Sequence, residues 1–395
     1  MINESGEIIP YEIIPITKPT LPPLDEYRSR LEQLWETGRI TNGPLVREAE
    51  ALLEYYIHDT HCVAMANCTI GLILAVQALG LQGAVVLPSF TFVASAHSLI
   101  WNGLEPVFAD IDKQTWNLSP ACVEEILEQR GDVSAILGVH IFGNPCQVRE
   151  LETLARRHDI KLLFDAAHAL GSESNGKKVG GFGDIEVFSL SPTKPAVSAE
   201  GGMASTRHEE LAEVLRYGLD YGNEGDSNTR FVGLNGRLSE LHAAMALGSL
   251  EMLEENLKRR NEVASRYVNI LSSIPGIRFQ HTRQGDQSNY KDLTVLIENE
   301  EFGMSRDTLS WWLDRARIDT RKYYFPPVHR TSAYWDRWGK YRDEELPVTN
   351  WVSENVLSLP LWSHMDNGIV DHVCEMVTSA HSRAEEISAL VAEST

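Results

Sequence analysis

The chain has 395 residues, 56 of them acidic and 35 basic, so its formal net charge is -21. This length buries a large core and favours two domains, while the negative charge argues against nucleic acid or an anionic membrane as the main partner. Five cysteines without a CxxC pair favour a reducing cytoplasm and argue against a zinc site, so no metal is expected.

The amino-terminal residues are predicted to form an arm rather than a targeting segment. The stretch "MINESGEIIPYEIIPITKP" lacks the basic start and the apolar block of a signal peptide. The proline-rich "PITKPTLPPL" predicts an extended arm, and such arms often pack on a partner subunit. We expect this arm and a first helix to occupy residues 1–40.

An uncharged run from Thr60 to Leu104 is long enough to suggest a membrane-spanning segment. Glutamines, glycines and a proline interrupt the run, so we divide it into shorter elements. These are predicted strands at 62–66 and 84–87, and predicted helices at 69–80 and from about 93. Because the run is apolar throughout, it predicts a buried α/β core with both faces of its sheet covered.

Strands and helices keep alternating in the residues that follow. Further strands are predicted at 106–110, 134–140 and 161–165, and helices at 119–129 and 147–158. Such alternation predicts an α/β fold with a mostly parallel, doubly wound sheet. A long helix beginning near Arg237 then leads into a more polar, mixed region. We therefore expect a large α/β domain over residues 41–255 and a smaller α+β domain over 256–395.

One lysine lies in an unusual loop, "FSLSPTKPAVSAEGG", between two predicted strands. Pro192 and Pro195 flank Lys194, and a residue that precedes proline is excluded from the helical region, so the loop is a stiff extended turn. A solvated surface lysine is the simplest interpretation. A lysine fixed by a rigid loop near a sheet is also a candidate for Schiff-base chemistry, because partial desolvation lowers the pKa of its amine.

The segment "FDAAHALGS" supplies two groups that could face the same ligand. Asp165 ends an apolar strand at its carboxyl end, where open α/β sheets bind ligands. It would either pair with a cationic ring nitrogen or cap the next helix. His168 follows three residues later and either approaches the same ligand or belongs to the core.

Two further segments have features of a ligand site. In "MANCTIGLIL" a strand gives way to a helix at Asn67, Cys68 and Thr69, whose free backbone amides either bind an anion or form an ordinary N-cap. In "PSFTFVASA", Phe90 and Phe92 follow a strand. One of these rings could form a flat wall over an aromatic ligand, or both could be core residues.

Taken together, these segments resemble the DegT/DnrJ/EryC1/StrS family of sugar aminotransferases. The resemblance covers nearly the whole chain and is carried by "ITNGPLVREAEALLEYY", "NCTIGL", "PSFTFVASAHSLIWNGLEPVFADID", "FDAAHALGS", "FSLSPTKPAVSAEGG", "GLNGRLSELHAAMAL" and "LSLPLW". It implies a pyridoxal-5'-phosphate (PLP) enzyme with the fold of aspartate aminotransferase, known as fold type I. The segments "PTLPPLDEY", "WNGLEPVF" and "GNPC" are most similar to family members that aminate nucleotide-linked 4-keto-6-deoxyhexoses.

The resemblance also implies roles for the residues around the cofactor ring. Lys194 would be the Schiff-base lysine, and Asp165 would pair with the pyridinium nitrogen. Phe92 would stack on the cofactor, and His168 would contact its other face or its phenolic oxygen.

The same resemblance implies where the cofactor's phosphate binds. Cys68 and Thr69 at the helix start would hold it together with Ser189, and Asn235 of "GLNGR" would reach in from a second subunit. The enzyme would therefore be a homodimer with a shared active site.

The chain departs from the family pattern in three ways near the cofactor. Asn67-Cys68-Thr69 stands where many members have Ser-Gly-Thr, which adds a side chain where glycine lets the backbone approach closely. Ser191 stands where relatives often carry histidine, and the two prolines beside Lys194 are also unusual.

The resemblance further implies L-glutamate as amino donor and a nucleotide-linked keto sugar as acceptor, for which we expect dTDP-4-keto-6-deoxyglucose, aminated at C4. In "RIDTRKYYFPPVHR", Arg321, Lys322 and His329 either meet the acceptor's diphosphate or lie in a solvated basic loop. A 3-keto sugar and an aminocyclitol ketone are the alternative acceptors.

Two other functions are possible within the same family. Its dehydratases carry histidine in place of the lysine, so Lys194 argues against that mechanism. A non-catalytic cofactor sensor fused to a DNA-binding module would carry a basic helical appendage, which this acidic chain lacks.

Overall fold

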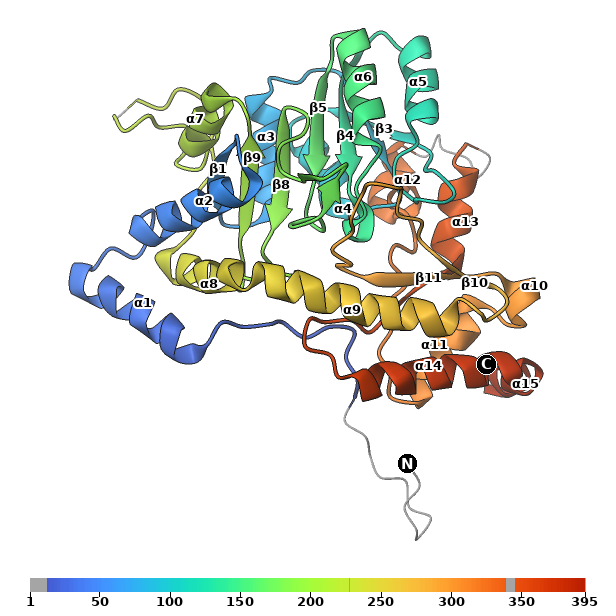
Figure 1. The fold of residues 1–395 in the computed structure, drawn as a ribbon. Helices are drawn as coiled ribbons and strands as arrows, with labels where there is room; N and C mark the ends of the chain where they lie inside the picture. The colour runs from blue at the N-terminus through green and yellow to red at the C-terminus, as the bar shows by residue number, and fades with distance from the viewer. Residues whose placement is uncertain (1–12, 227, 339–344, 395) are drawn as a thin grey trace.

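The computed structural model describes residues 13–226, 228–338 and 345–394 (Figure 1). In these residues one seven-stranded sheet has the order β1-β9-β8-β5-β4-β2-β3. Its strands are β1 (His61–Met65), β2 (Ala84–Pro88), β3 (Glu105–Ala109), β4 (Val133–Val139), β5 (Lys161–Asp165), β8 (Ile185–Ser189) and β9 (Gly202–Thr206). Only β9 runs antiparallel to its neighbours, so the predicted mostly parallel α/β sheet is confirmed.

Helices cover both faces of this sheet. On one face lie α3 (Cys68–Ala78), α4 (Val93–Trp101) and α7 (Glu209–Gly218). On the other face lie α5 (Pro120–Gln129) and α6 (Val148–His158), with α2 (Pro44–Ile57) beside β1. In β2, Val85 and Leu87 pack on the first face while Ala84 and Val86 pack on the second, as the two-residue period of a strand requires. Burial on both faces explains the long uncharged run.

The segment before the first helix contacts the carboxyl-terminal half of the chain. Ile14 forms a bridge with Ile318, in which the Ile14 amide donates to the Arg317 carbonyl at 2.9 Å. The helix α1 (Leu24–Thr37) follows. Residues 1–12 of the predicted arm lie outside the described residues, and the predicted domain limits stay predictions.

The prediction of one long helix starting near Arg237 is wrong. The structure has α8 (Glu240–Glu251) and α9 (Leu253–Leu271), which meet at Met252. The first of them begins after Ser239, whose hydroxyl accepts a hydrogen bond from the backbone amide of His242 at 3.2 Å. Figure 1 shows α9, in yellow, running from the large sheet to the small one, so this helix connects the two halves of the molecule.

The carboxyl-terminal half is α+β. Its sheet consists of β10 (Ile277–Phe279), β11 (Leu293–Ile297) and β12 (Val356–Leu359), and all pairs are antiparallel. The helices of this half are α10 (Asn299–Phe302), α11 (Arg306–Arg315), α12 (Ser332–Trp338), α13 (Pro347–Asn355), α14 (Asn367–Ser382) and α15 (Ala384–Ser394). An apolar core between β11, α9, α11 and α14 stabilises this half.

Two absences hold for the described part of the chain. None of its helices combines the length and the apolar character that crossing a membrane requires. Its described residues also contain no group of three or more histidine, cysteine, aspartate or glutamate side chains that could hold a metal ion.

Candidate active site

A cavity of about 300 Å³ opens at the carboxyl ends of the parallel strands. Val139 ends β4, Asp165 ends β5 and Ser189 ends β8, and all three line the cavity. The other lining residues are Asn67, Cys68, Thr69, Thr91, Phe92, Ala94, Ala167, His168, Ser191, Thr193, Lys194, Glu200, Lys291, Tyr323 and Tyr324. The predicted cofactor residues thus come together at one edge of the sheet, except for Asn235.

Asp165 is a buried carboxylate held by two hydrogen bonds. The Ser95 hydroxyl donates to Oδ2 at 2.7 Å, and the Ala167 amide donates to Oδ1 at 3.0 Å. Burial raises the pKa of this carboxyl above its ordinary value, although these hydrogen bonds and the nearby Lys194 act against the shift. A cation in the cavity would therefore stabilise the ionised form.

Lys194 lies between β8 and β9, as predicted, in a turn where its amide donates to the Ser191 carbonyl at 3.0 Å. Its side chain lines the cavity that Asp165 also lines. Desolvation, together with the positive charge of Lys291, lowers the pKa of Lys194 to about 7. The amine is thus substantially neutral at physiological pH, and a neutral amine can act as a nucleophile or a base.

The amino-terminal end of α3 meets the same cavity. Asn67 is the N-cap, and its side chain accepts a hydrogen bond from the Ile70 amide at 2.9 Å. Within the described residues, the amides of Cys68 and Thr69 have no hydrogen-bond acceptor, so the helix end can bind an anion. A Cβ on Gly202 would lie 2.6 Å from the Cys68 nitrogen, so only glycine allows β9 to approach so closely.

His168 is neutral and oriented by two contacts. Its Nδ1 accepts a hydrogen bond from the Phe142 amide at 3.1 Å, so Nε2 carries the ring proton. That nitrogen lies 3.3 Å from the Tyr324 hydroxyl. Burial lowers the pKa of His168 well below its ordinary value, with the neighbouring lysines as further causes.

Two phenylalanines predicted near the ligand differ in their surroundings. Phe92 is 57% exposed and lines the cavity, where its ring lies 6.4 Å from that of Tyr324. Phe90 is buried among core residues and packs edge-on against Phe142. Phe92 is therefore the ring that can cover a flat ligand.

Asn235 does not reach the cavity of its own chain. It lies in an exposed segment, where its side-chain oxygen accepts a hydrogen bond from Arg237 at 3.2 Å. A role at the cofactor therefore requires a second copy of the chain, as predicted.

The three predicted acceptor contacts do not line the cavity either. Arg321 pairs with Asp319, and Lys322 lies 2.5 Å from Asp307, both at the exposed surface. His329 is only 3% exposed, and the Ser89 hydroxyl lies 2.7 Å from its Nδ1. The structure therefore corrects the expectation for His329, because a buried ring that is bound to its neighbours cannot meet a diphosphate.

Among the lining residues that sequence reasoning missed, three stand out because they bring aromatic rings or a charge into the cavity. Tyr323 and Tyr324 stand directly after Lys322, and Lys291 precedes β11. The aromatic pair inside the basic stretch "RIDTRKYYFPPVHR" was the available signal. No local pattern marks Lys291, whose position depends on long-range contacts.

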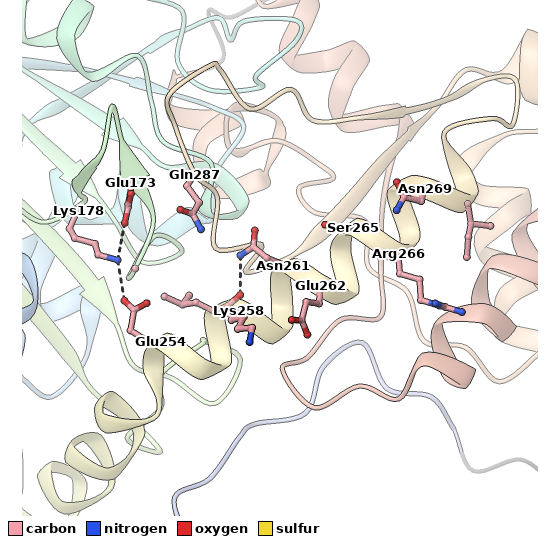
Figure 2. Close-up of a pocket in the computed structure, with 13 residues that line it drawn as sticks. Glu173, Lys178, Glu254, Lys258, Asn261, Glu262, Ser265, Arg266, Asn269 and Gln287 are labelled. Atoms are coloured by element: carbon pink, nitrogen blue, oxygen red, sulfur yellow. Dashed lines mark hydrogen bonds and ion pairs between the residues drawn. The ribbon is translucent and has the colours of Figure 1, made fainter.

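A larger hollow of about 730 Å³ lies along α9, outside this site (Figure 2). Charged and amide side chains line it, among them Lys258 and Glu262, and Lys178 bridges Glu173 and Glu254 at its end. No strand of the seven-stranded sheet ends in it, and none of the predicted cofactor residues line it. Its size alone does not make it the active site.

Comparison with known proteins agrees with the geometry of the cavity. Residues 24–378 match the model of the DegT/DnrJ/EryC1/StrS aminotransferase family. The chain belongs to this family. It is therefore a PLP-dependent aminotransferase, and it has the expected fold.

Three relatives show how far the similarity extends. The dTDP-4-amino-4,6-dideoxy-D-glucose transaminase of Escherichia coli is 33% identical over 366 residues, which are 92% of this chain and 98% of the relative. The dTDP-3-amino-3,6-dideoxy-alpha-D-galactopyranose transaminase of Aneurinibacillus thermoaerophilus is 30% identical over 89% of this chain and 94% of the relative. The structure of DesI in the presence of its TDP-sugar product is 32% identical, covers 98% of this chain and 97% of DesI, and has a TM-score of 0.90.

The residues of the cavity fit PLP. The cofactor carries a phosphate, an aldehyde and a basic ring nitrogen. The cavity offers the unpaired amides of Cys68 and Thr69 for the phosphate, the neutral amine of Lys194 for the aldehyde, and the buried carboxylate of Asp165 for the nitrogen.

Proposed function

We propose that this enzyme transfers the amino group of L-glutamate to C4 of dTDP-4-keto-6-deoxyglucose. The observation that carries the transfer chemistry is the neutral amine of Lys194 in one cavity with the buried carboxylate of Asp165. Similarity to a 4-amino-4,6-dideoxyglucose transaminase and to DesI with its TDP-sugar product supports the acceptor.

The cavity residues would hold the cofactor in one orientation. The amides of Cys68 and Thr69 and the hydroxyl of Ser189 would bind its phosphate. Phe92 would cover one face of its ring, and His168 would contact the ring from the other side or at the phenolic oxygen.

Asp165 and Lys194 would carry out different tasks. When bound, PLP acts as an electron sink that stabilises negative charge at the donor's α-carbon. Asp165 would keep the ring nitrogen protonated, since its buried carboxylate is most stable beside a cation. Lys194 would take the proton from the donor's α-carbon on Nζ and deliver it to the carbon that becomes the amine-bearing carbon of the cofactor.

The active form would be a homodimer. Asn235 is exposed in its own chain, and large apolar side chains around it are exposed as well, namely Tyr221 at 51% and Val232 at 84%. A second copy packed here would bury these residues and bring Asn235 to its neighbour's phosphate site. All five cysteines are free thiols, which supports a cytoplasmic location.

Arg321 and Lys322 would bind the acceptor's diphosphate. They are exposed and directly precede Tyr323 and Tyr324, which line the cavity. Their present partners are surface aspartates, and such ion pairs exchange at little cost. A 3-keto sugar is the second candidate, because the relative from Aneurinibacillus thermoaerophilus makes a 3-amino sugar.

The function is tested by incubating the purified enzyme with PLP, amino donors and dTDP-linked 4-keto or 3-keto sugars, with product mass as the readout. We expect the 4-amino sugar from L-glutamate. Exclusive amination of a 3-keto sugar or a cyclitol ketone would contradict the C4 assignment. Borohydride should bleach the cofactor's visible absorbance and attach it to the peptide that contains Lys194.

A further inference from the structure

A second lysine shares the cavity with Lys194. Lys291 is only 6% exposed, yet its side chain lines the cavity. Its ammonium donates to both carboxylate oxygens of Asp292 at 2.9 Å and lies 5.5 Å from the centre of the Tyr323 ring. Buried lysines are rare and costly, so the position of this one calls for a function.

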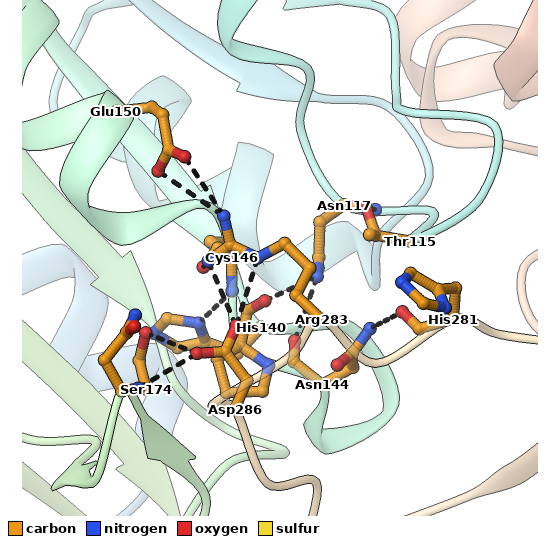
Figure 3. Close-up of polar contacts among 12 residues, drawn as sticks. Thr115, Asn117, His140, Asn144, Cys146, Glu150, Ser174, His281, Arg283 and Asp286 are labelled. Carbon is orange, nitrogen blue, oxygen red and sulfur yellow. Dashed lines mark hydrogen bonds and ion pairs between the residues drawn. The ribbon is translucent and has the colours of Figure 1, made fainter.

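Lys291 is held by a loop that contacts the large α/β half both at its start and at its end. Figure 3 shows the start of this loop, where Asn144 donates to the His281 carbonyl at 2.9 Å and Arg283 donates to the Cys146 carbonyl at 3.0 Å. The loop and the residues after β4 are thereby joined.

The end of the loop is fixed even more tightly. The side-chain amide of Asn289 donates to the carbonyls of His168 at 2.7 Å and Leu170 at 2.9 Å, while its oxygen accepts from the Lys291 amide at 2.8 Å. A Cβ on Gly143 would lie 1.9 Å from the Asn289 oxygen, so glycine is required for this approach. The backbone of Lys291 is therefore set in place before any ligand binds.

The charges around Lys291 leave an excess of positive charge. The guanidinium of Arg260, itself 2% exposed, donates to the carbonyls of Tyr290 at 2.9 Å and Lys291 at 2.7 Å. Burial lowers the pKa of Arg260 only to about 10, so it stays charged at neutral pH. Two cations thus stand against the single carboxylate of Asp292.

The ammonium of Lys291 also keeps a free donor. An ammonium has three N–H groups, and the two hydrogen bonds to Asp292 account for two of them. Among the described residues it has no further hydrogen-bond acceptor. The third N–H can therefore bind an anion that enters the cavity.

We propose that Lys291 binds the α-carboxylate of the amino donor, with Asp292 and Arg260 holding it in place. This proposal rests on the proposed function, since it supplies a binding site for the donor of that reaction. Apart from Lys194, Lys291 is the only lysine or arginine among the described lining residues.

The position of Lys291 favours the donor over the acceptor. The donor's carboxylate carbon is about 1.5 Å from the α-carbon that reacts, so it must lie in the cavity that holds Lys194. The acceptor's diphosphate lies across the sugar ring from C4 and can reach the exposed rim. A buried cation beside Lys194 therefore suits the carboxylate.

The test measures the binding of glutarate, a dicarboxylate without an amino group that cannot react. Its dissociation constant is obtained from the change in the visible absorbance of the PLP-loaded enzyme. Lys291→Met should weaken glutarate binding about 10- to 100-fold, as the loss of one charge-assisted hydrogen bond predicts. Lys291→Arg should restore most of the affinity because it keeps a cation.

Two further variants make the result specific. Lys291→Met combined with Asp292→Asn removes both charges, so no unpaired carboxylate remains buried, and it should lose glutarate affinity as the single variant does. Lys258→Met removes an exposed lysine from the hollow along α9 and should bind glutarate like the wild type.

Wild-type glutarate affinity in Lys291→Met and in its combination with Asp292→Asn would overturn the proposal. Unchanged glutarate affinity with a raised acceptor KM would assign Lys291 to the diphosphate and would also overturn it. If the wild-type enzyme aminated no sugar, the proposed function would fail, while the glutarate titration would still decide the role of Lys291.

Discussion

The two sides of the cavity are built differently. The side formed by the large sheet consists of strand ends and a helix start, which present Asp165, Ser189 and the amides of Cys68 and Thr69. The opposite side consists of two loops of the carboxyl-terminal half, which present Lys291, Tyr323 and Tyr324. The first side offers groups for a cofactor that all family members share, and the second offers groups that can differ with the substrate.

Lys194→Ala should give the largest effect on the sheet side. Removing the base should lower kcat about 1000-fold, because a positioned proton-transfer group contributes on this scale. Stopped-flow absorbance of the donor half-reaction measures the loss. Lys177→Ala, a matched change at an exposed lysine, should behave as the wild type. Normal turnover by Lys194→Ala would remove the proposed role.

Asp165→Asn should lower kcat roughly 100-fold while PLP still binds. An amide cannot stabilise a ring cation as a carboxylate does, so the ring loses its capacity to accept charge. Ser95→Ala removes only one of the hydrogen bonds to Asp165 and should cost less. Steady-state kinetics of both variants make the comparison, and wild-type turnover by Asp165→Asn would leave the residue as a helix cap alone.

The difference between the two sides also explains what the sequence could predict. Asp165 ends one strand and Lys194 follows another, and the apolar patterns of both strands are local and strong, so their meeting at the sheet edge follows from parallel topology. Lys291 is positioned by Asn289, whose side chain donates to carbonyls 119 and 121 residues away in sequence, and by Arg260, which donates to carbonyls 30 and 31 residues away. No local pattern encodes such contacts.

Two predictions made from the sequence differ from the structure. The basic stretch was correctly placed near the cavity, but its charges pair with Asp319 and Asp307 of the same half, and its tyrosines face the cavity instead. The predicted long helix is interrupted at Met252, where α8 ends and α9 begins. The Lys322–Asp307 pair and the position of the tyrosines at the cavity involve residues outside the basic stretch, whereas Asp319 lies within it.

Asn289→Ala should show that the loop side depends on its contacts with the sheet side. The change leaves the carbonyls of His168 and Leu170 and the amide of Lys291 without partners, which should lower the free energy of unfolding by about 2 kcal/mol. Urea unfolding measures this loss. Asn269→Ala, at an exposed position on α9, is the control and should be nearly neutral.

Arg321→Ala and Lys322→Ala should each raise the acceptor KM about 10-fold and leave the donor half-reaction unchanged. Loss of one charge-assisted contact to a phosphate accounts for this size. Arg278→Ala removes another ion-paired surface arginine of the same half and should change neither quantity. Wild-type acceptor kinetics in both variants would place the diphosphate elsewhere.

The pH dependence of stability should show how the two sides interact. In the folded protein without PLP the pKa of Lys194 is about 7, against an ordinary value of 10.5. Between these values the unfolded chain binds a proton that the folded protein does not, so the free energy of unfolding should rise with pH. The rise should be at most about 1.4 kcal/mol per pH unit relative to Lys194→Met, and it should vanish below pH 7.

Urea unfolding of the two proteins at pH 6, 7, 8 and 9 makes the measurement, with Lys177→Met as the control. Desolvation by burial is the larger cause of the shift, and the positive charge of Lys291 on the loop side is the second. In a Lys291→Met background the pKa of Lys194 should therefore move up, and the rise should begin at a higher pH. If the free energy of unfolding of the wild type differed from that of Lys194→Met by the same amount from pH 6 to 9, folding would not change the proton affinity of Lys194. Its proposed role as a base at neutral pH would then lack a physical cause.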